Sequence, residues 1–500
     1  MKLYVHSMSF FLYLLLLSPF LILSVYLFDS FKLDSFFSFF VFDQEFLNSL
    51  AFTFKQSFFS TIITIFLGFL GSLGLLGIKK SNLQKKIIIF FLLPNFIPTL
   101  FIALSFFSIS SWFSVIFYGL PAIVLTHVFI NTGLCSILFF SLFKKKISNI
   151  ANLAFVESCS FISFWYAVIK LLKYELLISI LFFFALYFTS FSIPLLLSSG
   201  IDRTLEVFIY EKILLQGSWS QAMFLSMVQV FIFTCFGIIF YFFKKKYSLF
   251  NNKQTSLDYS NGLFYFSSTL CLLVPFFISS VIVLGFLSII IKAGLNNLNL
   301  ISWHLYYYSF IQGFFVGLGV FVLLLLTASL GFKSYFRKFL TFYISPSLVL
   351  MGFSYLILSK VYNLEAIKYF LLFLALSILF WPIFYRLKLE SLIESLKMQF
   401  YLAQTLGASY FFILKKIIFP QVLTYIGFAS GISALWGSGD FALSLILLPK
   451  DVSLSLAIHS LLSSYRWEQA AAYSFLLLIL GLFLFYLFNN FFISFLKKIN

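Results

Sequence analysis

Residues Leu402–Pro420, LAQTLGASYFFILKKIIFP, lie in the last of the chain's basic loops, between two long apolar runs. The segment opens with small and polar residues such as Gly407 and Ser409. Aromatic and apolar residues follow, and then the pair Lys415 and Lys416 precedes the proline. This pattern predicts a short helix that is small on one side and apolar on the other, and helices of that kind dock onto a partner.

The composition indicates a membrane protein. The 500 residues are 62% hydrophobic and 10% charged, with a mean hydropathy of +1.06. Soluble domains carry about 25% charged residues, so we expect an all-α polytopic membrane protein. About twelve apolar runs approach the roughly 20 residues that a helix needs to cross a bilayer. The predicted spans are 9–28, 52–78, 87–110, 120–142, 174–197, 221–243, 263–291, 307–331, 338–359, 367–386, 421–447 and 470–491.

Basic residues follow every second predicted span. Lys79 and Lys80 follow the second span, for example, and Lys144–Lys146 follow the fourth. Cytoplasmic loops of membrane proteins carry an excess of Lys and Arg, so both termini are expected to be cytoplasmic. This topology explains the net charge of +17. We therefore predict contact with the lipid bilayer and no nucleic-acid partner.

The chain also contains an internal repeat. NLAFVESCS (Asn152–Ser160) aligns with YLAQTLGAS (Tyr401–Ser409), 249 residues later (401 − 152 = 249), and SWSQAM (Ser218–Met223) aligns with RWEQAA (Arg466–Ala471). Two six-span halves around a central pathway are typical of transporters. The expected organisation is a first helix and external loop (1–47), a first core (48–243), a cytoplasmic linker (244–262), a seventh helix and external loop (263–305), a second core (306–491) and a cytoplasmic tail (492–500).

Motifs for energy conversion and metal binding are absent from the sequence. It contains no G-x-x-x-x-G-K-[ST], so this chain is not expected to hydrolyse ATP. The four histidines are far apart, and the four cysteines form no CxxC pair. We therefore predict free thiols, no metal site and no cofactor in this chain.

The segment that opens this section resembles the EAA loop of binding-protein-dependent ABC importer permeases. The resemblance rests on Ala403, Leu406, Gly407, Ala408, Ser409 and Pro420, the last of which follows the glycine by thirteen residues (420 − 407 = 13). It implies the type I importer fold, a bacterial inner-membrane location, and a periplasmic substrate-binding protein as one partner. The second implied partner is a cytoplasmic ATPase dimer that receives a coupling helix from each half. The alternative is an interfacial amphipathic helix that binds nothing.

The first half departs from the EAA pattern. It retains Ala154, but Glu157 replaces the leucine, Ser158 replaces the glycine and Leu171 stands at the position of the proline. The resemblance therefore implies that the second half carries the stronger coupling.

Two further stretches are similar to fused permeases of the thiamine and iron(III) group. These are Tyr118–Pro121 with the run that follows it, and Gly439-Asp440-Phe441 with the residues after it. The resemblance implies thiamine or a thiamine phosphate as the substrate, with iron(III) as the alternative.

Asp440 falls inside the eleventh predicted span, where a carboxylate is costly unless it faces water or a partner. Two interpretations are open: it faces the translocation pathway and favours a cation, or it caps a helix beside the break Gly437–Gly439. Trp436 also has two interpretations: its ring makes a cation–π contact with a substrate in the pathway, or it packs between helices.

Two other classes of protein compete with the importer. Major-facilitator secondary transporters carry a G-x-x-x-D-R-x-G motif after their second span, and here that loop, GIKKSNLQKK, has neither acid nor arginine. A polytopic enzyme would need a polar catalytic cluster at the membrane surface, and the sequence offers none.

Overall fold

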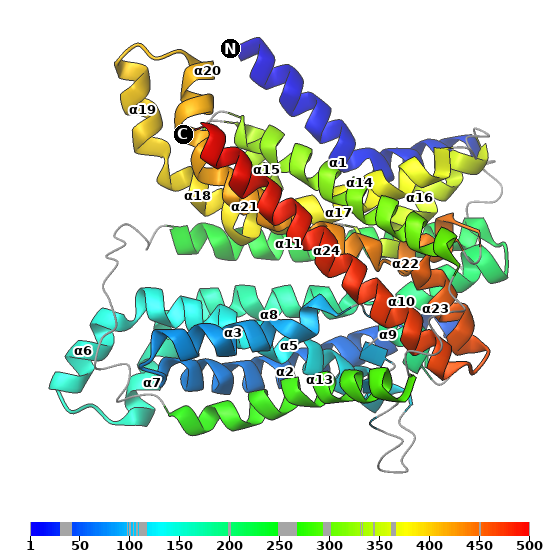
Figure 1. The fold of residues 1–500 in the computed structure, drawn as a ribbon, viewed down its shortest axis with the longest axis horizontal. Helices are drawn as coiled ribbons and strands as arrows, with labels where there is room; N and C mark the ends of the chain where they lie inside the picture. Colours follow the sequence, from blue (N-terminus) through cyan, green and yellow to red (C-terminus); the bar gives the residue numbers. More distant parts are fainter. Residues whose placement is uncertain are drawn as a thin grey trace. The chain divides into compact units, whose positions relative to one another are not determined.

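The computed structural model describes residues 2–30, 43–97, 118–198, 202–248, 268–293, 302–330, 334–343, 346–361, 367–449 and 452–499, together with residues 99, 102, 103, 105, 106, 109 and 332. All regular secondary structure in these residues is helical (Figure 1). The all-α prediction is confirmed. Most of the predicted linker and parts of the predicted external loops and third span lie outside the described residues.

Eight stretches of the described residues are long and apolar enough to cross a membrane, and a ninth forms if α7 and α8, bent by 73° at their junction, make one span. A multi-pass membrane protein is confirmed, and the number of twelve spans stays a prediction. The long helices are α1 (Lys2–Ser30), α2 (Gln44–Leu76), α5 (Leu120–Lys146), α11 (Trp219–Ser248), α14 (Trp303–Ala328), α17 (Lys368–Phe384), α21 (Phe419–Ser438) and α24 (Trp467–Ile499).

The remaining elements connect or flank these helices. The α-helices are α3 (Ser81–Phe96), α6 (Ser148–Val156), α7 (Phe161–Leu171), α8 (Lys173–Phe188), α9 (Ser192–Leu197), α10 (Leu205–Tyr210), α13 (Leu273–Ala293), α15 (Tyr335–Phe342), α16 (Leu348–Val361), α18 (Glu390–Ser395), α19 (Lys397–Thr405), α20 (Tyr410–Ile413), α22 (Ala442–Leu447) and α23 (Leu454–Ser463). The π-helical turns are η3 (Glu211–Leu215), η7 (Tyr385–Leu389) and η8 (Leu414–Ile418), and η4 (Thr269–Leu272) is a 3₁₀ turn.

Three predicted spans break into two helices. The run 421–447 divides into α21 and α22, 174–197 divides into α8 and α9, and 338–359 divides into α15 and α16. Small or polar residues stand at the first two breaks, and Pro346, which has no backbone N–H, stands at the third. Asp440 therefore lies in a link between helices, which corrects its predicted place inside a span.

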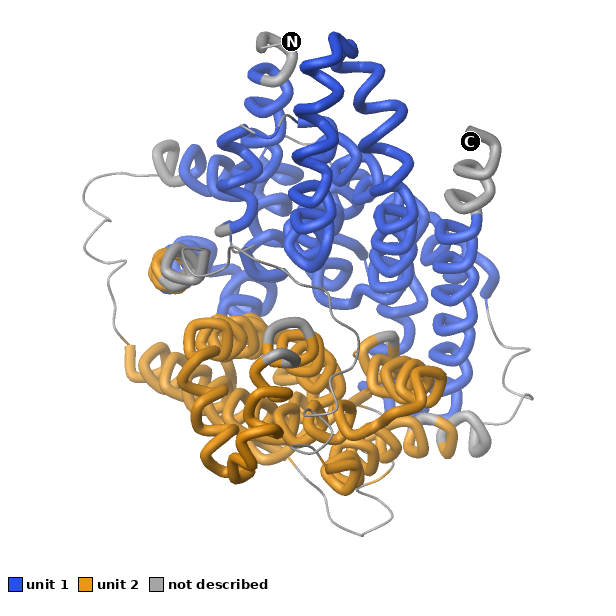
Figure 2. Tube along the Cα trace, turned by 90° about the vertical axis from the view of Figure 1, so that its left-hand side faces the viewer, with its two compact units in different colours: residues 1–41, 209–233, 293–500 blue, residues 42–208, 234–292 orange. Residues whose placement is uncertain are grey.

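Contacts between helices divide the chain into two compact units (Figure 2). Unit 1 comprises residues 1–41, 209–233 and 293–500. Its core is α14 packed against α21 and α17, with α24 on α21. Gly313 allows α14 and α21 to pack closely, because a Cβ at this position would lie only 2.7 Å from the Ala434 carbonyl oxygen. The first helix of the chain belongs to this unit, where Ser18 Oγ lies 2.8 Å from the Tyr355 hydroxyl of α16.

Unit 2 comprises residues 42–208 and 234–292. Its core is α2 packed along α5, with α8 on α2 and α3 on α5. The segment η4–α13, which follows the predicted linker, also belongs to this unit, because η4 packs against α2. The contact units therefore differ from a simple division of the chain at its linker: α1 groups with the second half, and α13 groups with the first.

Candidate functional site

The predicted docking segment is a tight turn between two helices. α19 ends at Thr405, and its last carbonyl groups are satisfied from beyond the helix: Ala408 N–H donates to Ala403 O over 3.0 Å, and Gly407 N–H donates to Gln404 O over 3.0 Å. This pair of bonds is the Schellman motif, which requires a left-handed residue. Gly407 supplies it with a φ of 81°, at no steric cost.

A new helix starts directly after the turn. The Ser409 hydroxyl accepts a hydrogen bond from Phe412 N–H over 3.3 Å and so caps α20. α20, η8 and α21 then continue as one helical stretch from Tyr410 to Ser438. The expectation of one short helix over Leu402–Pro420 is wrong, since that segment holds a helix end, a turn and a helix start. Pro420 lies in the first turn of α21, directly after the π-helical turns, where hydrogen-bond register changes and its missing N–H is tolerated.

The equivalent turn of the first half has the same backbone. Cys159 N–H donates to Ala154 O over 2.9 Å, and Ser158 N–H donates to Phe155 O over 3.1 Å. Ser158 takes the left-handed position with a φ of 52° although it is not glycine. Ser160 caps α7 by accepting from Ser163 N–H over 3.3 Å. Replacing the glycine has therefore left the shape of the turn unchanged.

Apolar side chains stand out from both turns. Leu406 is 86% exposed, and Phe411 on the next turn of helix is 73% exposed. At the first turn Val156 is 79% exposed, and Ile162 beyond the cap is exposed as well. Glu157, which occupies the position of Leu406, is also exposed. Exposed apolar residues on rigid, capped turns are suited to contact a partner.

The second turn is tied to the body of unit 1. The Tyr410 hydroxyl donates to the carbonyl oxygen of Ser329 at the end of α14. The ring of Phe332 lies 4.9 Å from that of Phe400 on α19, centroid to centroid. A load on this turn would therefore reach α14 through side-chain contacts as well as along the chain.

Asp440 caps a helix. Its Oδ2 accepts hydrogen bonds from the backbone N–H groups of Leu443, over 3.1 Å, and Ser444, over 3.2 Å, at the start of α22. The Ser455 hydroxyl donates to the Asp440 carbonyl oxygen over 2.8 Å. Trp436 stacks on Phe384 of α17, with ring centroids 5.6 Å apart. These contacts support the capping and packing interpretations, and a pathway role for either residue stays a prediction.

Polar contacts recur in the two units at matching positions. Thr53 Oγ1 accepts from Leu205 N–H over 2.8 Å, as Ser309 Oγ accepts from Leu454 N–H over 2.9 Å. Three residues further along each helix, Gln56 donates to the Tyr187 carbonyl oxygen over 2.8 Å, and Gln312 donates to that of Gly437 over 2.9 Å. The residues of each matching pair, Thr53 with Ser309 and Gln56 with Gln312, are 256 positions apart in the sequence (309 − 53 = 256 and 312 − 56 = 256). This correspondence supports the predicted internal repeat.

Unit 2 contains a buried polar cluster around His127. Its Nε2 lies 2.9 Å from Ser190 Oγ, and its ring stacks on Tyr187 at 4.8 Å between centroids. The Tyr187 hydroxyl in turn lies 2.8 Å from Thr64 Oγ1 of α2. Ser190 occupies the position of Asp440 in the repeat (440 − 190 = 250). The first half therefore places a histidine–serine pair where the second half has a carboxylate cap.

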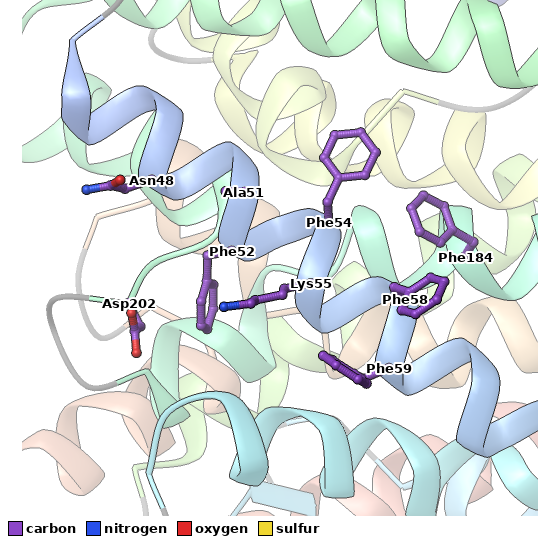
Figure 3. Close-up of a pocket in the computed structure, with 9 residues that line it drawn as sticks. All are labelled: Asn48, Ala51, Phe52, Phe54, Lys55, Phe58, Phe59, Phe184 and Asp202. Carbon is purple, nitrogen blue, oxygen red and sulfur yellow. The ribbon is translucent and has the colours of Figure 1, made fainter.

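A pocket of about 680 Å³ opens beside the first turns of α2 (Figure 3). One end holds the charged groups, Lys55 of α2 and Asp202 of the segment before α10, and in this view the ring of Phe52 lies between them. The other end is aromatic, and its rings include Phe58 and Phe184. The remaining lining residues are Asn48, Ala51, Phe52, Phe54 and Phe59.

One known family matches part of the second half. Residues 325–498 match the binding-protein-dependent transport system inner membrane component family. The match covers the turn at Gly407 and the Asp440 cap, and it supports a permease of a binding-protein-dependent ABC transporter. This permease family is a transport component and not a catalytic subunit. The chain has no match among curated proteins or among solved structures.

The sequence pointed to the segment around Gly407, but it did not reveal how the turn there is stabilised. Gly407 lies at the turn itself, with a positive φ of 81°. The caps at Ser409 and Ser160 were not predicted, although serine before an apolar helical run is a recognisable start signal. The pocket at Lys55 was not predicted either, because Asp202 is far from Lys55 in the sequence and only the folded chain brings both to one pocket.

Proposed function

We propose that the chain is a permease with two fused halves in an ATP-driven importer, and that the turns at Ala403–Ser409 and Ala154–Ser160 dock onto a separate ATPase dimer. The family match over residues 325–498, which includes the turn at Ala403–Ser409, carries the proposal. The turn at Ala154–Ser160 supports the fused arrangement, because its backbone hydrogen bonds repeat those of the turn at Ala403–Ser409. A periplasmic substrate-binding protein is the second proposed partner, and the bacterial inner membrane, with both termini in the cytoplasm, is the proposed location.

Two docked turns would couple ATP hydrolysis to transport. Closure of the ATPase pair would pull on both turns, and the helices that leave them, α20–η8–α21 and α7–α8, would rock between outward-open and inward-open arrangements. The two connections differ mechanically. The helix after the second turn continues through η8 into α21, whereas α7 and α8 are bent by 73°. A continuous helix transmits displacement along its axis more directly than a bent pair does.

Purification of the full chain from its native membranes tests the proposal. We expect an ABC ATPase to co-purify in a ratio of two per chain, and ATP-dependent uptake to disappear when that ATPase is removed. A chain that supports uptake driven by a proton gradient, with no ATPase retained, would contradict the proposal and favour the secondary transporter.

Thiamine or a thiamine phosphate is the proposed substrate, and iron(III) is the alternative. Support comes from the resemblance at Tyr118–Pro121 and Gly439–Phe441. The ligand that the partner binding protein retains decides between the two, since that protein selects the substrate. Binding of iron(III) without any thiamine derivative would overturn thiamine and leave the importer assignment intact.

The Asp440→Asn variant tests the pathway role separately. Asparagine also caps helices well, so α22 would keep its cap while the negative charge is lost. If the carboxylate attracts a cationic substrate, the Michaelis constant for uptake rises. An unchanged uptake rate and Michaelis constant would restrict Asp440 to capping.

A further inference from the structure

The pocket beside α2 has the polarity of a lipid molecule. In Figure 3 the Lys55 amine points to the side on which Asp202 lies, while Phe58 and Phe184 occupy the opposite end. We propose that this pocket binds one phospholipid with a phosphoethanolamine headgroup. The lipid phosphate would bind Lys55, its ammonium group would bind Asp202, and an acyl chain would lie over the phenylalanine rings.

The neighbouring charges leave Lys55 and Asp202 available for this headgroup. Arg203, next to Asp202, pairs with Glu45 at the start of α2, with 2.8 Å between Nη2 and Oε2. The Thr53 hydroxyl holds the same segment against α2 by accepting from Leu205 N–H. Asp202 is thereby fixed beside α2. Among the described residues, no ion pair engages Lys55.

Helix length places the pocket at headgroup depth. Lys55 precedes the end of α2 at Leu76 by 21 residues (76 − 55 = 21), which is about 32 Å at 1.5 Å per residue. The hydrocarbon core of a bilayer is about 30 Å thick. If Leu76 lies at one boundary of that core, Lys55 lies at the other, where a lysine amine meets phosphate. Phe58 is one helical turn further in, at acyl-chain depth.

The two charges favour a zwitterionic headgroup that can donate hydrogen bonds. A lone lysine would attract any phosphate, but the Asp202 carboxylate at the same end of the pocket repels a headgroup with net negative charge. A primary ammonium group offers hydrogen bonds to that carboxylate, and a trimethylated ammonium group does not. The repeat position of Lys55 is Ile311 (311 − 55 = 256), so we assign the site to unit 2 only.

Native mass spectrometry of the full chain in nanodiscs tests the site. The nanodiscs would contain equal fractions of phosphatidylethanolamine, phosphatidylcholine and phosphatidylglycerol. We expect the wild-type chain to retain phosphatidylethanolamine preferentially. Lys55→Gln should lower that retention by about tenfold, the loss expected for one charge-assisted hydrogen bond. Asp202→Asn should shift the preference toward phosphatidylglycerol.

Matched variants and a soluble competitor separate the proposal from simpler explanations. Lys55→Arg keeps the cation and should keep the lipid, whereas Lys80→Gln removes a charge beyond the other end of α2 and should change nothing. Equal loss in Lys80→Gln would reveal general surface charge and overturn the proposal, as would a wild-type preference for phosphatidylglycerol or equal retention of all three lipids. Displacement of the lipid by equimolar soluble phosphoethanolamine would also overturn it, because the site would then recognise a solute.

Discussion

The turns at Gly407 and Ser158 share one backbone and differ in chemistry. Both contain the same two capping hydrogen bonds, a left-handed residue and a serine cap. The second turn exposes Leu406 where the first exposes Glu157. The backbone shape of the proposed docking turn therefore recurs in both halves, while its exposed side chains differ. We infer that the asymmetry between the halves lies in affinity for the partner and not in the fold.

Exchanging the differing side chains should have the largest effect. Leu406→Glu gives the second turn the chemistry of the first. Loss of an exposed apolar anchor at an interface centre is worth about 2 kcal/mol or more, so ATPase retention and uptake should fall by roughly thirtyfold. Co-purification of the co-expressed ATPase measures this, and the reverse change, Glu157→Leu, should hold or increase retention.

Leu215→Glu is the matched control for that exchange. Leu215 is 72% exposed in η3, away from either turn in the sequence, and its replacement should leave ATPase retention unchanged. Undiminished retention in Leu406→Glu would show that this turn is not the docking element.

A smaller effect follows from exchanging the left-handed residues. A Cβ at Gly407 would meet no atom within 4 Å, so only the backbone angle opposes a side chain there. Gly407→Ser should weaken the turn by about 1 kcal/mol, and Ser158→Gly should strengthen the other turn by a similar amount. Hydrogen exchange at the amides of Ala408 and Cys159 measures both. If neither amide changes its protection, the left-handed geometry carries no strain.

The smallest effect should be the same at both turns. Ser409→Ala and Ser160→Ala each remove a helix cap. Each change should lower the stability of the first helical turn by about 0.5 to 1 kcal/mol, because both sites are exposed. Exchange at the amides of Phe412 and Ser163 reports the loss. Unequal losses would show that the two turns differ in construction as well as in surface.

The turns at Gly217 and Tyr465 show that the loss of glycine is not confined to the first half. Gly217 has a φ of 64° in the first half, and its repeat position in the second half is Tyr465, with a φ of 59° (465 − 217 = 248). Here the second half carries the strained residue. Of these two paired positions, each half has glycine at one and a larger residue at the other.

The sequence was sufficient for the fold class and for locating the two segments that contain the turns, although it predicted a helix in place of the turn at Gly407. Composition and hydropathy predict a helical membrane protein because a bilayer leaves few other structures available. The repeat located the turns because matching residues recur at a nearly constant separation. Contacts between distant residues could not be predicted in this way. The Asp440 cap, the contact of His127 with Ser190 and the placement of Asp202 in the pocket that Lys55 lines each depend on packing that no local pattern encodes.

The grouping of α1 with the second half has a consequence during synthesis. Ser18 and its partner Tyr355 are 337 residues apart. At roughly 5–20 residues per second, the ribosome needs about 17–70 s to make the intervening chain. For that interval the first helix must remain in the membrane without its contact to α16, so a chaperone or insertase that shelters it would raise the yield of folded protein.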